Sequence, residues 1–293
     1  MNWLFVVILA YFLFAVVSLV DRRILKGPPN AKIYAFYVGI LGILSLLLAP
    51  FVGFFIPELH KIIFCLFAGI IYFFALFSLF SGLEKFEASR IIPAVGGFLP
   101  IFTLLLVYSF SDGKESLNYI EILAFLFLVL GSVVVSWQTS FKISFEALAI
   151  SFLSAFFLSL SLILAKNVYL ALPFWTGFLW IRVGAFLSAL FFLFLGSVRK
   201  EIFSGASAFS RKTGALFIFN QGIGAGAFIL QNWAIALAGL AYLSIINALQ
   251  GIQYVFLFIL AALFLKESLS KKIIIQKVAA ILLIGAGLAI LTI

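Results

Sequence analysis

The sequence predicts an all-α integral membrane protein whose ten transmembrane helices form a 5+5 inverted repeat. Of its 293 residues, 66% are hydrophobic and only 10% are charged, whereas about a quarter of a soluble globular chain is charged. The mean hydropathy is +1.30. The apolar runs have the length of ~20 residues that a helix needs to cross a bilayer. Their arrangement recurs once along the chain, which indicates two related halves.

Charges, a Pro-Pro pair and Gly-Ser clusters divide the apolar runs into ten segments. The runs are too long and too continuously apolar for the alternating strands of a membrane barrel. The intervening loops have roughly ten residues or fewer each, which leaves no room for a soluble catalytic domain. The predicted spans are about 2–20, 33–56, 61–82, 89–110, 117–137, 147–165, 174–198, 213–237, 242–265 and 273–293.

The distribution of positive charge predicts the orientation of these spans. Loops after odd-numbered segments carry fifteen Lys and Arg residues, and loops after even-numbered segments carry three. Because cytoplasmic loops are enriched in cations, we expect the odd-numbered loops in the cytoplasm and both termini outside a prokaryotic inner or cell membrane. The net charge of +9 is therefore a topology signal and does not indicate nucleic-acid binding.

Short matches indicate two repeats, residues 1–140 and 141–293. Because five spans are an odd number, the second repeat must cross the membrane in the opposite sense to the first. Inverted repeats of this kind serve alternating access to one central site, although a duplication that only stabilises a bundle is the alternative. The matches pair Pro28 with Pro173, Gly39 with Gly184, and the Lys-Glu-Ser-Leu run at 114–117 with the same run at 266–269.

The ten spans in a 5+5 repeat, the prolines Pro93 and Pro100 in the fourth span, and the Lys-Glu-Ser-Leu run before each half's last span resemble the EamA-type transporters of the drug/metabolite transporter superfamily. The resemblance covers essentially the whole chain. It implies a single-chain metabolite transporter, often an exporter of amino acids or related small polar solutes, and not an enzyme. Many members keep both termini in the cytoplasm, and the charge count departs from that pattern.

Arg182 is the one ionisable residue clearly inside a predicted span, ~12 Å along a helix from Phe174. A charge at this depth is costly unless it faces a cavity or a partner. We therefore expect its guanidinium to face the central cavity and hold a carboxylate or phosphate. A structural arginine that binds carbonyls or extends to the interface is the alternative.

Helix breakers and amides mark two equivalent spans, the fourth and the ninth. Gly96, Gly97 and Pro100 interrupt the fourth span, and the ninth carries amides at a spacing of three residues. Interruptions in corresponding spans of two repeats point to a binding site. We expect these residues to line the cavity, with helix-to-helix hydrogen bonding by the amides as the alternative. The amides are Asn247, Gln250 and Gln253.

The eighth span adds Gln231 and Asn232 as secondary cavity contacts. We expect Arg90 and Lys166 to mark cavity mouths, with anchoring at the membrane interface as the alternative. Alternating glycines in the eighth span predict close packing against another helix. These are Gly222, Gly224 and Gly226.

These residues predict a secondary transporter that moves, and most simply exports, a small carboxylate-bearing metabolite such as an amino acid. Nucleotide-sugar or sugar-phosphate exchange and lipid-headgroup flipping are variants of this function, and a non-transporting membrane scaffold is an alternative of another class. No Asp or Glu lies in the middle of a span. This disfavours the extrusion of lipophilic cations that proton-coupled relatives of the family perform with a carboxylate in the first span.

The expected partners are a small-molecule substrate and the lipid bilayer, without nucleic acid. Cys65 is the single cysteine and His60 the single histidine, so we expect no disulfide, no metal site and no cofactor. The sequence leaves the oligomeric state open.

Overall fold

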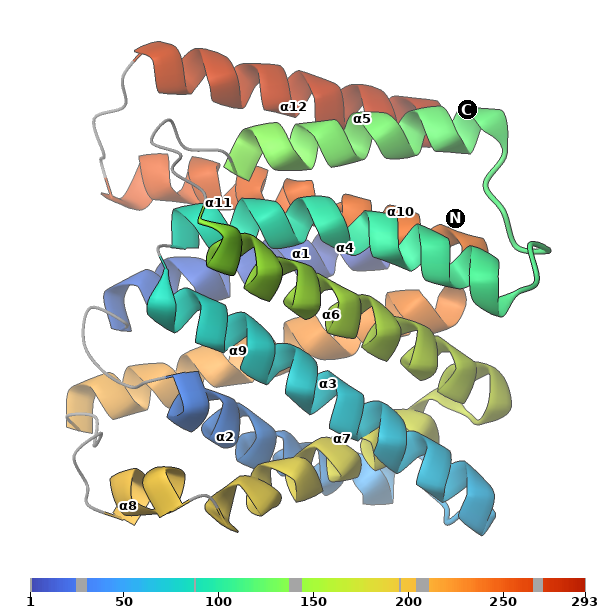
Figure 1. Cartoon of the computed structure of the whole chain (residues 1–293), viewed down its shortest axis with the longest axis vertical. Coiled ribbons are helices and arrows are strands. Elements are labelled where there is room, and N and C mark those ends of the chain that lie inside the picture. Colours follow the sequence, from blue (N-terminus) through green and yellow to red (C-terminus); the bar gives the residue numbers. More distant parts are fainter. Residues whose placement is uncertain are drawn as a thin grey trace.

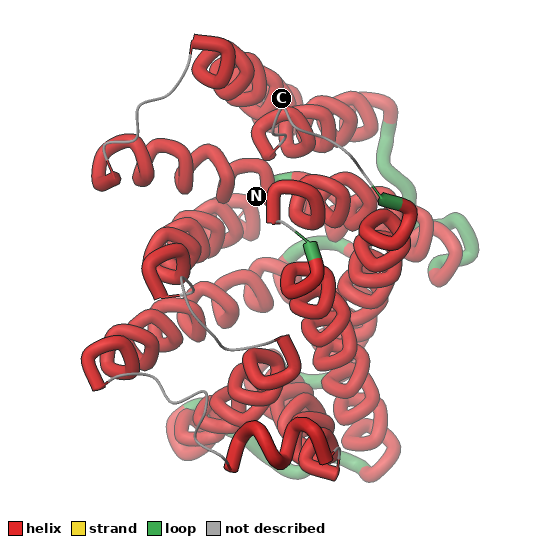
Figure 2. The backbone as a smooth tube through the Cα atoms, turned by 60° about the vertical axis from the view of Figure 1, so that its left-hand side comes forward, coloured by secondary structure: helices red, strands yellow, loops and turns green. Residues whose placement is uncertain are grey.

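The structure is a computed structural model that describes residues 2–24, 31–86, 88–136, 144–194, 196–203, 211–265 and 271–292. Within these ranges every regular element is helical (Figures 1 and 2). The elements are α1 (Asn2–Ile24), α2 (Ala31–Gly42), the 3₁₀ helix η1 (Ile43–Phe51), α3 (Leu59–Lys85), α4 (Ala88–Phe110), α5 (Tyr119–Ser136), α6 (Phe145–Ala171), α7 (Phe174–Phe191), η2 (Phe192–Phe194), α8 (Gly196–Phe203), α9 (Arg211–Leu237), η3 (Leu240–Tyr242), α10 (Leu243–Ala248), α11 (Gln250–Leu265) and α12 (Lys271–Thr292).

Seven helical stretches within the described residues are long and apolar enough to cross a membrane. The structure also has three shorter apolar stretches. The seven long and three short stretches lie at the positions where the sequence predicts ten spans. The all-helical, multi-pass character of the chain is confirmed, whereas the ten-span 5+5 repeat stays a prediction. The shorter stretches are Ala35–Phe51, Ala94–Phe110 and Tyr119–Val135.

Three predicted spans are not single α-helices, and the ninth is described with the site below. The segment 33–56 changes from α2 to the 3₁₀ helix η1 at Ile43, and η1 contains Pro50. Proline has no backbone N–H, so Pro50 removes one helical hydrogen bond. The segment 174–198 ends as an α-helix at Phe191, and the separate short helix α8 follows a 3₁₀ turn.

The helices pack in pairs that join distant parts of the sequence. α1 packs along α9, α3 along α6 and α7, α4 along α6, and α5 along α12. The last of these pairs is seen at the top of Figure 1. Both chain termini lie on the same side of the bundle (Figure 1), as an even number of membrane crossings requires.

Two helix crossings depend on glycines that allow backbones to touch. At the crossing of α3 and α7, a Cβ on Gly69 would collide with the carbonyl oxygen of Ile181, and a Cβ on Gly184 would collide with the backbone of Leu66. At the crossing of α5 and α12, a Cβ on Gly131 would lie 2.6 Å from the Ile284 side chain. The hydrophobic effect does not drive helices together in lipid. Close packing at small residues stabilises such crossings instead.

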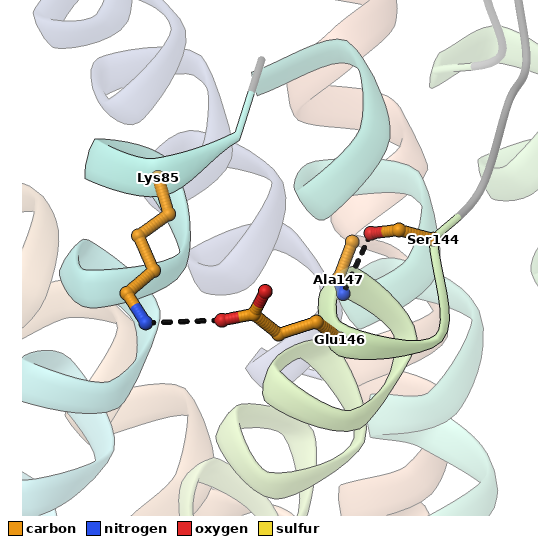
Figure 3. Close-up of polar contacts among 4 residues, drawn as sticks. All are labelled: Lys85, Ser144, Glu146 and Ala147. Carbon is orange, nitrogen blue, oxygen red and sulfur yellow. Dashed lines mark hydrogen bonds and ion pairs between the residues drawn. The ribbon is translucent and has the colours of Figure 1, made fainter.

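Side chains satisfy the free backbone groups at helix ends. Ser144 caps α6 by accepting a hydrogen bond from the Ala147 N–H at 3.2 Å, and Glu146 in the same first turn forms an exposed ion pair with Lys85 at 3.0 Å (Figure 3). The cap satisfies one of the four N–H groups that lack partners at the start of a helix. The ion pair is too exposed to add much stability.

We expect Gly184→Val to weaken the α3–α7 crossing. The added Cβ meets backbone atoms, which cannot rotate away as a flexible side chain can. Overpacking of this kind costs about 1–3 kcal/mol, so the thermal midpoint of the purified protein in detergent should fall by roughly 5 °C. Gly285→Val is the matched control, because a Cβ there meets no atom within 4 Å. Equal midpoints for the two variants would contradict the crossing.

Candidate functional site

The Arg182 side chain on α7 lies between aromatic rings of two other helices. Its guanidinium carbon is 4.9 Å from the ring centre of Phe228 on α9 and 5.7 Å from that of Tyr72 on α3. The two rings are 5.2 Å apart, and the guanidinium lies against both. Electron-rich ring faces attract a guanidinium. We call Arg182, Tyr72 and Phe228 the Arg182 cage.

Gly42, the last residue of α2, completes the cage on a fourth side. A Cβ at this position would overlap the Arg182 guanidinium, so glycine provides the space that the charge occupies. α2 and α3 belong to the first predicted repeat, and α7 and α9 to the second. The predicted interior charge therefore lies where the two halves of the chain meet.

A second polar cluster surrounds the Tyr11 side chain of α1. Its hydroxyl donates a hydrogen bond to the carbonyl oxygen of Ile246 at 2.7 Å, and the Gln231 side chain of α9 lies beside it. Gln231 follows Phe228 by three residues, so the Arg182 cage and this second cluster are one helical turn apart, ~5 Å along α9. The side chain of Asn232 instead faces α6 and accepts a bond from the Tyr169 hydroxyl at 2.8 Å.

The ninth predicted span is interrupted at Leu249, between α10 and α11. The Tyr11 hydroxyl donates to the Ile246 carbonyl oxygen, and the Ser132 hydroxyl donates to the Ala248 carbonyl oxygen at 3.4 Å. Side chains that enter the helical bonding pattern in this way are a known cause of kinks. The ninth span is therefore interrupted at a leucine that the sequence does not mark as a helix breaker, and side chains of other helices bind two of its carbonyls.

The interruption directs the three predicted amides of this span to different surroundings. Asn247 is buried and donates to the Thr103 hydroxyl at 2.6 Å, while Gln253 donates to the Ser18 hydroxyl at 3.3 Å. The Oε1 atom of Gln250 is buried and has no hydrogen-bond partner among the described residues. Two of the amides thus join helices, and Gln250 has an acceptor free for a ligand.

The fourth predicted span is a continuous helix, contrary to the sequence-based expectation. α4 passes through Gly96, Gly97 and Pro100 without a break. A Cβ on Gly96 would lie 3.9 Å from the Tyr254 hydroxyl, and one on Gly97 would lie 3.3 Å from Val133. Pro100 is buried and offers no N–H to the carbonyl four residues earlier. α4 absorbs this loss without ending.

Of the two predicted mouth residues, Lys166 is buried and engaged. Its side chain on α6 donates to the carbonyl oxygen of Ala236 at 2.9 Å, in the last turn of α9. A cation there satisfies a free carbonyl and complements the negative end of the helix dipole. Arg90 is on α4, but its side chain lies outside the described part of the structure.

The predicted close packing of the eighth-span glycines is wrong for two of the three. A Cβ on Gly222 or Gly226 would meet no atom within 4 Å, and one on Gly224 would be at an ordinary 3.7 Å from Val17. Among the described residues, no helix covers this face of α9. Gly222 and Gly226 face open space because α1 packs on the opposite side of the helix, against Asn220 and Gly224.

Sequence reasoning missed Tyr11, Tyr72, Phe228 and Gly42. In a chain with 38 Phe and 9 Tyr, aromatic residues near a site look like those that face lipid. No local spacing distinguishes them. Only the tertiary contacts with Arg182 and with the interrupted helix do so.

Comparisons with known proteins agree with this architecture. Residues 1–137 match the EamA-like transporter family. No curated protein matches the sequence. The fold is similar to a solved crystal structure at a TM-score of 0.73 and 17% sequence identity, over 100% of this chain and 99% of that one. At this identity the likeness is informative about the fold alone.

We expect Asn247 and Thr103 to stabilise the protein as a pair. Asn247→Leu and Thr103→Val should each lower the free energy of unfolding in detergent, and the double variant should lose about 0.5–2 kcal/mol less than the sum. Ser109→Ala is the control, because the Ser109 hydroxyl bonds a carbonyl of its own helix. Additive losses would contradict the pair.

Proposed function

We propose that this chain, whose residues 1–137 belong to the EamA-like transporter family, is a secondary transporter that exports a small carboxylate-bearing metabolite by alternating access. The observation that carries the proposal is the Arg182 cage. It is a cation inside the bundle, at the junction of helices from both halves, and its described contacts are neutral groups. An amino acid or a related small acid fits such a site.

The pairing of helices supports the 5+5 inverted repeat, with units 1–140 and 141–293. If α1 corresponds to α6 and α3 to α9, the contact of α1 with α9 has its equivalent in that of α6 with α3. The contact of α4 with α6 likewise has its equivalent in that of α11 with α1. This exchange of roles is what a central site shared by two inverted halves requires.

The chemistry of the cage favours a carboxylate. The guanidinium presents several N–H donors in one plane and forms short, charge-assisted bonds with carboxylate oxygens. The Tyr72 ring lies against the guanidinium, and its hydroxyl can donate its proton to the same anion. The two side chains would therefore hold one carboxylate together.

The Tyr11 cluster supplies a position for a second polar group of the substrate. It lies one turn of α9 from the cage, and the unpartnered Gln250 Oε1 is within one turn of the Ile246 carbonyl that Tyr11 binds. An amide oxygen accepts hydrogen bonds. A hydroxyl or ammonium group next to the carboxylate would fit this position, so α-hydroxy and α-amino acids are the substrates we propose to test first.

The proposed direction is export. Both termini lie on one side of the bundle, and the loops rich in Lys and Arg follow the odd-numbered spans, which favours those loops in the cytoplasm.

Two pairs of residues would shape the cavity walls: the amides Asn247 and Gln253, and the glycines Gly96 and Gly97. Asn232 and Pro100 would lie behind them. Lys166 and Arg90 would stand toward its ends.

We expect Arg182→Gln to abolish counterflow or lower the affinity for carboxylates by about tenfold to a hundredfold, because a charge-assisted bond contributes about 1.5–3 kcal/mol. The measurement is counterflow in proteoliposomes against labelled amino acids, hydroxy acids, nucleosides and sugar phosphates. Arg182→Lys should retain part of the activity. Lys85→Gln, which removes an exposed cation, is the control. Normal carboxylate counterflow by folded Arg182→Gln protein would remove this residue from the site, and loss of assembly alone would favour a scaffold.

We expect Gln250→Leu to reduce counterflow of an α-hydroxy or α-amino acid by about fivefold or more, since one neutral hydrogen bond contributes about 1 kcal/mol. Counterflow of the same acid without the hydroxyl or amino group should be unchanged. Gln276→Leu is the control, because this amide lies on α12 and donates to the Val134 carbonyl at 2.8 Å. An unchanged ratio between the two acids would argue against Gln250 as a ligand.

A further inference from the structure

The described surroundings of the Arg182 guanidinium are electrically neutral. Its contacts are two aromatic rings and the backbone at Gly42. Tyr72, the described titratable group against the guanidinium, is uncharged at neutral pH. A charge inside a membrane protein normally has an ionic partner, and no described side chain supplies one to Arg182.

The carboxylates whose side chains the structure describes lie at the periphery. Glu121 accepts bonds from the Tyr242 hydroxyl at 2.6 Å and from the Asn118 N–H at 2.8 Å, and Glu146 pairs with Lys85. These carboxylates stand at helix ends or in connecting loops. They are Glu58, Glu84, Asp112, Glu115, Glu121 and Glu146.

We infer that the substrate itself is the counter-ion of Arg182, so that the protein exchanges molecules that each carry one net negative charge. The inference rests on the proposed function and narrows it. With such a monoanion bound, the site is neutral and the loaded protein changes state without moving net charge. Without it, the protein must change state with one uncompensated positive charge, which is the slower step.

The aromatic rings are suited to this role. They stabilise the guanidinium weakly while the site is empty. A carboxylate in their place would pair with Arg182 permanently and compete with the substrate. The cage therefore keeps the cation available and leaves its full neutralisation to the molecule that is carried.

The test uses the full-length protein in proteoliposomes, with valinomycin and potassium to set the membrane potential. It measures the exchange and the net efflux of a monocarboxylate that undergoes counterflow. Its exchange rate should be the same at zero potential and at a tenfold potassium gradient of either sign. Net efflux into substrate-free medium should be slower than exchange. An inside-negative gradient should speed that efflux about threefold, if half the field acts at the barrier.

Two outcomes overturn the inference and leave the proposed function standing. One is exchange of the monocarboxylate that responds to potential as strongly as net efflux does. The other is potential-independent exchange of a zwitterionic amino acid of the same skeleton, because its complex with Arg182 would carry a positive charge. Absence of any carboxylate flux from folded protein would remove the proposed function and the inference together.

Phe228→Glu provides a second test, since it places a carboxylate beside Arg182. With a built-in counter-ion the empty protein is neutral, so the ratio of exchange to net efflux should fall by roughly tenfold. Phe228→Gln, which loses the ring without adding charge, should keep the wild-type ratio. Equal ratios in the two variants would overturn the inference, and a misfolded Phe228→Glu protein leaves the decision to the potential measurements.

Discussion

The fold depends on the requirement that polar groups shielded from water by lipid find partners inside the protein. Many of these partners come from the other half of the chain. Tyr11 of α1 binds the carbonyl freed by the interruption at Leu249, Thr103 of α4 receives the Asn247 amide, and Ser78 of α3 bonds Ser154 of α6 at 2.7 Å. These bonds fix which helices can be neighbours, and thereby bring the functional side chains together.

The same requirement distinguishes two cations of the described interior, Lys166 and Arg182. Lys166 has a helix-end carbonyl as its partner. Arg182 lies against aromatic rings, which give its charge no opposite charge. The two cations differ in the group that each contacts.

Sequence reasoning succeeded where composition carries the signal, because hydropathy predicts the all-helical membrane class. A charge within a span directs attention to Arg182, whose role as a ligand stays a prediction. Sequence reasoning was less informative about where helices break, because a break depends on contacts with other helices. Pro100 suggests a break, yet α4 continues through it, whereas Leu249 has no breaking tendency and yet stands at the interruption. Neighbouring helices pack against α4 and keep it continuous. In the ninth span, the Tyr11 hydroxyl binds a carbonyl at the interruption between α10 and α11.

The burial of Cys65 makes the protein convenient for chemical labelling. The thiol is 1% exposed and packs among apolar side chains of α3, α6 and α7. It is the single cysteine of the chain. A cysteine introduced on the uncovered glycine face of α9 would therefore be the one thiol within easy reach of a reagent. Spin or fluorescent probes could follow that face in otherwise native protein, without the usual removal of competing thiols.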